Sequence, residues 1–219
     1  MYLLVMQDIS GFSALHYIHE MIHEDSYPKK GGVMTLASVG EWFCTVAFGD
    51  LDTVRDNIDT YAGARSQNGD TALMVAARCN SSEIVRILAP KEYGLRNHDG
   101  YTALFIAIHY NSLAAVEILV HYEAYLNIKE RLTPLHYAVA LNRMTCILPL
   151  MTALGHERDM CGRTPTDLAY LMGHFDIAIF LSVRGYNCTP SVSSPTLVDH
   201  VHHFYKIYFE AAFDIPGAE

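Results

Sequence analysis

A 31-residue period constrains what this 219-residue chain can fold into more than any other feature of its sequence. A threonine returns at that step four times, and a glycine two residues ahead of it keeps the step, except where Arg131 takes its place. The recurring positions are Thr71, Thr102, Thr133 and Thr164, Gly69, Gly100 and Gly162, and Leu88, Leu119, Leu150 and Leu181. One more unit in the same frame, with Val54 in the valine position, precedes the first threonine. Five units in one register predict a stack of similar modules that share a continuous core.

Each unit has the sequence pattern of a helix pair. A turn around the glycine starts the unit, because glycine takes a positive φ without steric cost. The threonine is a favoured N-cap for a short Ala-rich helix, and a polar break such as "CNSS" or "YNSL" leads to a second helix. A single pair cannot bury both of its faces, so the pairs must stack. Pro149 falls inside the second helix of its unit, where we expect a kink or an early helix start.

The units "DGYTALFIAI" and "RLTPLHYAVA" resemble the ankyrin repeat, whose signature is T-P-L-H-x-A. The resemblance covers about five repeats over residues 36–186. The usual ankyrin period is about 33 residues, two more than the step found in this chain. The resemblance implies an all-α solenoid of stacked helix-turn-helix units with short β-turn fingers.

The segments outside the array have their own patterns. For residues 1–35 we predict a helical cap or a degenerate first repeat. The string "SGFSALHYI" resembles the repeat motif but does not fall at the 31-residue step. Residues 187–195 form a Ser/Thr/Pro connector, and residues 196–213 predict an amphipathic, aromatic-rich C-terminal helix with a capping box at Thr196 and Asp199. This helix either shields the open end of the array or serves docking or self-association.

The string "HEMIH" matches the zinc-protease pattern, with His19 and His23 as ligands and Glu20 as the base. A catalytic zinc needs a third protein ligand, and the sequence specifies none, although Glu41 is the nearest candidate beyond that helix. With twelve histidines in the chain, chance produces the pattern in about three such sequences per hundred, so a bare match is weak evidence of a site. We interpret the segment as a structural helix, with adventitious metal binding as the alternative and a zinc hydrolase as a remote one. We predict no metal site, no cofactor, no catalytic residue and no enzyme.

The net charge and the cysteine content limit which partners and which cellular compartment we expect. The formal net charge is −9 and Lys and Arg do not cluster, so the basic stripe of a nucleic-acid binder is absent from the sequence. The apolar opening "MYLLVM" is too short for a membrane span, and we expect no membrane insertion. Five cysteines without a C-x-x-C pair indicate free thiols in a reducing compartment. We therefore expect a cytoplasmic protein without a nucleic-acid partner.

The resemblance also implies a function, because ankyrin arrays bind proteins on a concave face. We predict a protein-interaction scaffold or adaptor, with a regulatory or inhibitory subunit of a separate enzyme as the alternative. In the family, contacts lie around the turn and at the end of the first helix. On this sequence we select Asp70, Arg78, His98, Asp99, Tyr101, His109, Tyr110, Leu132, Leu141, Arg163, Leu171 and Met172.

Two groups among these positions indicate how a partner binds. Tyr101, His109 and Tyr110 form an aromatic cluster of the kind that makes binding hot spots. Three later positions are apolar without a reason in the repeat motif, and these are Leu141, Leu171 and Met172. We expect the partner to dock across the third to fifth units, on an apolar strip with aromatic anchors.

Overall fold

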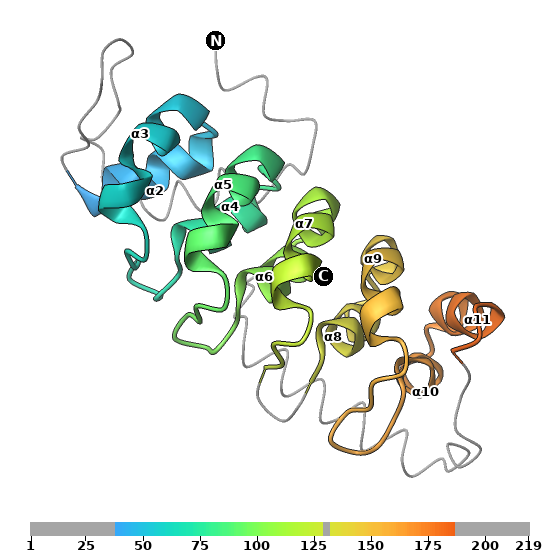
Figure 1. Cartoon of the computed structure of the whole chain (residues 1–219). Helices are drawn as coiled ribbons and strands as arrows, with labels where there is room; N and C mark the ends of the chain where they lie inside the picture. Colours follow the sequence, from blue (N-terminus) through green and yellow to red (C-terminus); the bar gives the residue numbers. More distant parts are fainter. Residues whose placement is uncertain (1–37, 129–131, 187–219) are drawn as a thin grey trace, which may run out of the picture. The chain divides into compact units, whose positions relative to one another are not determined.

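The computed structural model describes residues 38–128 and 132–186, and these residues form five successive helix pairs (Figure 1). The first helices are α2 (Val39–Phe48), α4 (Ala72–Arg78), α6 (Ala103–His109), α8 (Pro134–Ala140) and α10 (Pro165–Leu171). The second helices are α3 (Leu51–Tyr61), α5 (Ser82–Glu92), α7 (Leu113–Glu123), α9 (Met144–Leu154) and α11 (Phe175–Val183). The described residues contain no strand, so the predicted all-α class is confirmed.

The helices begin and end where the repeat pattern places them. The side chains of Thr71, Thr133 and Thr164 each accept a hydrogen bond from a backbone N–H of the first turn, as N-cap residues do. The polar break after the first helix contains a residue with positive φ, which turns the chain towards the second helix. Asparagine fills this position three times and glycine twice, at Gly49, Asn80, Asn111, Asn142 and Gly173.

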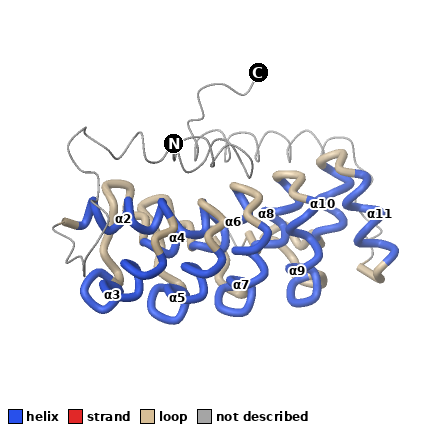
Figure 2. The backbone as a smooth tube through the Cα atoms, turned by 90° about the horizontal axis from the view of Figure 1, so that it is seen from above, coloured by secondary structure: helices blue, strands red, loops and turns tan. Residues whose placement is uncertain are grey.

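The described part of the chain divides into two compact units, residues 38–123 and residues 124–186. In the first unit, α2, α4 and α6 form one layer and α3, α5 and α7 a second layer (Figure 2). In the second unit, α8 packs on α10 and α9 packs on α11 (Figures 1 and 2). Each unit is thus a two-layer stack of helix pairs, as the sequence predicts.

The core of each unit is built from the same repeat positions. One repeat position carries an alanine in α4, α6, α8 and α10, and another carries a leucine in α4, α6 and α8; all of these side chains are inaccessible to solvent. The small alanine lets neighbouring helices approach closely. Trp42 takes the leucine position in α2, where it is 0% exposed and stacks on Tyr61 at 5.6 Å between ring centroids. The buried alanines are Ala76, Ala107, Ala138 and Ala169.

Two buried glutamates join consecutive helix pairs in the first unit. Glu92, at the end of α5, accepts hydrogen bonds from the backbone N–H of Gly63 at 2.8 Å and of Leu73 at 2.7 Å. Glu123 repeats both bonds 31 residues later, at 2.8 and 2.7 Å. Burial raises the pKa of both carboxyl groups. One side chain therefore bonds the loop after α3 and the first turn of α4.

One expected effect of Pro149, an early start of its helix, is absent. The helix α9 begins at Met144 and has 11 residues, as α5 and α7 have, so the expected early start is wrong. Pro149 is only half-buried, and on the solvent side water can replace the lost helical hydrogen bond at low cost.

Several sequence predictions fall outside the described residues. These are the cap or degenerate repeat over residues 1–35 with its zinc-like motif, the connector 187–195 and the C-terminal helix 196–213. Among the helices that are described, none combines the length and the apolar character needed to cross a membrane.

Candidate functional site

The three first helices of the first unit end on apolar side chains that solvent reaches. Phe48 is the last residue of α2, and Cys79 and Tyr110 are the C-caps of α4 and α6. Phe48 is 39% exposed, and the other two are half-buried. Each directly precedes the residue with positive φ that ends its helix, so the turn holds all three at the edge of the layer. We call Phe48, Cys79 and Tyr110 the helix-end row.

Arg78 and Asp70 connect the helix-end row to the neighbouring finger. Arg78 donates a hydrogen bond from Nη2 to Oδ2 of Asp70 at 2.8 Å. Its guanidinium carbon lies 5.1 Å from the centre of the Tyr110 ring, a distance typical of a cation–π contact. The ring of His109 meets the same tyrosine edge-on at 5.0 Å. Asp70 also accepts a hydrogen bond from Asn97 at 2.9 Å. These contacts hold Tyr110 in place and neutralise the charge of Arg78.

The fingers beside the row are stacked and carry exposed polar side chains. The backbone N–H of His98 donates to the carbonyl of Asn68 at 3.2 Å, which joins two successive fingers. The His98 ring packs over Gly69, where an added Cβ would lie 2.5 Å from it. Asp99 is exposed at the same tip. The fingers therefore place a polar rim next to an apolar row.

The structure brings only part of the sequence-predicted site together. His109 and Tyr110 are in contact, whereas Tyr101 packs beside Phe105 with ring centroids 6.3 Å apart. Leu141 and Met172 are half-buried C-caps of α8 and α10 in the second unit. Six of the twelve selected residues are at most 9% exposed, namely Asp70, Tyr101, His109, Leu132, Arg163 and Leu171. Partner binding by the twelve residues stays a prediction, and burial restricts which of them a partner can reach.

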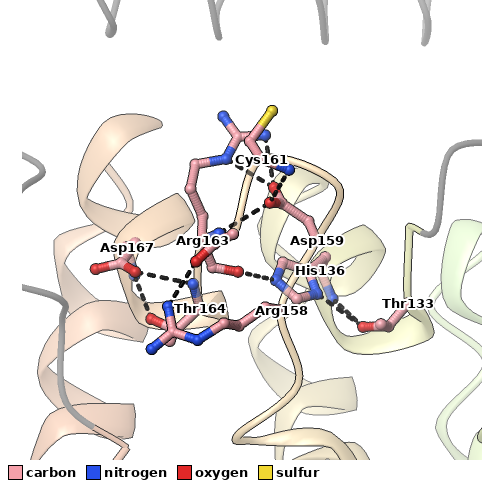
Figure 3. Close-up of polar contacts among 9 residues, drawn as sticks. Thr133, His136, Arg158, Asp159, Cys161, Arg163, Thr164 and Asp167 are labelled. Carbon is pink, nitrogen blue, oxygen red and sulfur yellow. Dashed lines mark hydrogen bonds and ion pairs between the residues drawn. The ribbon is translucent and has the colours of Figure 1, made fainter.

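In the second unit, a buried ion pair closes the finger before α10 (Figure 3). Arg163 donates from Nε to Oδ2 of Asp159 at 2.7 Å, and its side chain is 8% exposed. The other carboxylate oxygen accepts the backbone N–H groups of Cys161 at 2.8 Å and of Arg163 at 3.0 Å. Asp159 thus fixes the conformation of the turn. Arg163 pairs with Asp159 inside the finger and leaves little of its side chain exposed for a partner.

His136 joins that finger to α8 (Figure 3). Its Nε2 lies 3.0 Å from the carbonyl oxygen of Arg163, and its Nδ1 lies 2.8 Å from the hydroxyl of Thr133. A carbonyl oxygen only accepts, so Nε2 carries the proton and Nδ1 accepts from the threonine. Burial lowers the pKa of His136 below its ordinary value of 6.5, which keeps the folded imidazole neutral.

We expect the second unit to lose stability as the pH falls below about 6.5 because of His136. The folded histidine binds a proton only at lower pH than the unfolded one, so protonation favours the unfolded state. Urea unfolding at pH 7.5 and pH 5.5 measures the loss. His136→Met is the control, because Met74 occupies the equivalent buried position of α4. The variant should lose less stability between the two pH values, and an equal loss would contradict the assignment.

The described residues contain no metal-ligand cluster, and burial weakens three of their thiols as nucleophiles. No group of three His, Cys, Asp or Glu side chains lies close enough to hold a metal ion in residues 38–128 and 132–186. Burial raises the pKa of the Cys79 thiol to about 11. It also raises the pKa of Cys44 and Cys146. These thiols are therefore protonated near neutral pH and are poor nucleophiles.

Residues 42–130 match the family model of ankyrin repeats, in three copies. Residues 42–130 are an array of ankyrin repeats. The matched segment begins within α2 and extends beyond α7, and α8 to α11 continue it with two more helix pairs at the same 31-residue step. A search of the curated proteins gave no match to the chain. Ankyrin repeats are in general protein-interaction modules and are typically not enzymes.

The twelve residues selected from the sequence omit two members of the helix-end row, Phe48 and Cys79. Phe48 stands 31 residues before Cys79, so the period itself could have found it. The selection began with the second repeat, at Asp70, where the threonine signature is clear, and therefore left the first helix pair out.

Proposed function

We propose that this protein binds a partner protein through the helix-end row and the fingers of its first unit. The observation that carries the proposal is the row itself: an apolar side chain reaches solvent at the end of every first helix in the unit. An apolar centre beside a polar rim is the usual organisation of a protein interface.

Tyr110 is the residue best placed to anchor a partner. Contacts with Arg78 and His109 already restrict its ring, so little side-chain entropy remains to be lost on binding. Tyrosine is enriched among hot-spot residues because one ring offers apolar area and a hydroxyl. Since Asp70 pairs with Arg78, the row presents little net charge, and we infer a partner segment with apolar side chains.

The role that follows is that of a non-enzymatic scaffold or adaptor. The alternative, a regulatory or inhibitory subunit of a separate enzyme, would use the same surface. An assay of the captured partner with and without this chain separates the two roles. The described cysteines, Cys44, Cys79, Cys146 and Cys161, form no disulfide with one another, which supports our proposal of a reducing, cytoplasmic location.

We expect the paired change Phe48→Ala and Tyr110→Ala to weaken partner capture at least tenfold. Loss of a hot-spot aromatic typically costs 2 kcal/mol or more, and about 1.4 kcal/mol corresponds to a factor of ten. Capture from a native extract on immobilised full-length chain, with circular dichroism as the folding check, measures the effect. The matched control is Tyr93→Ala with Tyr122→Ala, two exposed aromatic residues on the second helices of the same unit. Equal losses in both pairs would refute the proposed site.

A further inference from the structure

The second helices of the two units differ at one outward position of the repeat. In α3, α5 and α7 this position carries a charged, exposed side chain, whereas in α9 and α11 it carries Leu148 and Ile179. These two side chains are 54% and 57% exposed. The charged counterparts at the same 31-residue step are Arg55, Arg86 and Glu117.

Neighbouring positions extend the apolar surface along both helices. Met144 is 39% exposed on α9, and Phe175 and Val183 are 58% and 79% exposed on α11. The two helices pack side by side (Figures 1 and 2). Within these two described helices, Asp176 is the one charged residue. We call Met144, Leu148, Phe175, Ile179 and Val183 the outer patch.

The fold itself does not require the outer patch. The first unit builds the same helix layer with charged residues at the position of Leu148 and Ile179. The inward positions are equivalent in both units, as Val85 in α5, Ile147 in α9 and Ala178 in α11 are all 0% exposed. Apolar residues at outward positions therefore indicate an interaction surface rather than a packing need.

We propose that the outer patch is the interface through which two copies of this chain form a symmetric dimer. The five side chains expose about 500 Å² in total, if a fully exposed side chain of this size has about 170 Å². A two-fold axis pairs the patch with itself and doubles the buried area to about 1,000 Å², near the lower limit for a specific interface.

Charge does not oppose a second copy at this place. The chain carries a formal net charge of −9, so two copies repel each other when they approach at random. At the outer patch, like-charged copies meet at low electrostatic cost, because α9 and α11 carry a single charge. A dimer would hold two helix-end rows, and two linked sites raise the avidity for a partner with repeated epitopes.

The test is sedimentation equilibrium on the full-length chain, whose monomer mass is 24.5 kDa. We expect a dimer at micromolar concentration and an increase of its dissociation constant of at least 100-fold for Leu148→Glu with Ile179→Arg. The first unit carries these residue types at this position, in Glu117 and Arg86, so the helices should tolerate them. Circular dichroism checks the fold.

Two further variants keep the test decisive. Val183→Asp introduces the residue that the first unit has at Asp59, at the most exposed position of the patch, and should weaken the dimer as well. Arg86→Ala with Glu117→Ala should leave the dissociation constant unchanged. A wild-type chain that stays monomeric would overturn the proposal. A monomer is also the result expected if residues 196–213 of the same chain cover the patch. A dimer that survives both patch variants would overturn it too.

Discussion

Replacing Asp159 by isoleucine is expected to lower the free energy of unfolding by about 3–5 kcal/mol, the usual cost of breaking a buried ion pair from one side. The substitution deprives the guanidinium of Arg163, which is 8% exposed, of its carboxylate. It also removes the acceptor of the backbone N–H groups of Cys161 and Arg163. Urea unfolding followed by circular dichroism measures the loss.

The repeat supplies a matched control for this change. In the preceding finger, Ile128 and Leu132 occupy the positions of Asp159 and Arg163 and make the same backbone hydrogen bond, at 3.2 Å against 3.0 Å. The double variant Asp159→Ile with Arg163→Leu imports this apolar pair. It should be more stable than the single variant, because no charge is left buried, although the two backbone N–H groups still lose their acceptor. A double variant as unstable as the single one would show that the ion pair is not the source of the loss.

The helix pairs could be predicted from the sequence because their signals are local. The threonine caps its helix through a bond to a residue three positions later, and the turn that ends the first helix depends on one asparagine or glycine. Such short-range features return with the period, and therefore the boundaries of α4 to α10 and the start of α11 follow the 31-residue step.

The candidate site was less predictable because burial depends on the neighbouring repeat. Tyr101, Leu132 and Arg163 stand at one repeat position beside the turn, where the family pattern predicts partner contacts. In the structure this position closes the finger through a backbone bond to the residue four places earlier, which turns the side chain inward. The outward position of the second helices carries no motif, so only the structure revealed the outer patch.

The glutamate bonds between helix pairs show the same limit. Glu92 meets Leu73 across 19 residues and Gly63 across 29 residues. A sequence pattern would have to link three elements to predict such a contact. Glu123 repeats the arrangement, but Leu154 takes the position one step later, so the feature is confined to the first unit.

Glu92→Ala is expected to destabilise the first unit by about 2–4 kcal/mol. The backbone N–H groups of Gly63 and Leu73 lose their acceptor, and Leu73 is 0% exposed. An unsatisfied buried donor typically costs about 1–3 kcal/mol, and the truncated side chain leaves a cavity in addition. Glu92→Gln retains one oxygen as an acceptor and should cost less, about 1 kcal/mol. Urea unfolding of the wild type, Glu92→Ala and Glu92→Gln gives the order of their free energies of unfolding.

The control for this series lies on the same helix. Glu83 is exposed in the first turn of α5, and Glu83→Ala should change the free energy of unfolding by less than about 0.5 kcal/mol, as surface substitutions do. A loss for Glu92→Ala no larger than that of Glu83→Ala would contradict the bonding role. A large loss confined to Glu92 would show that the first unit depends on a contact between helix pairs. Such a dependence is expected of a repeat array, because neighbouring repeats supply much of each other's stability.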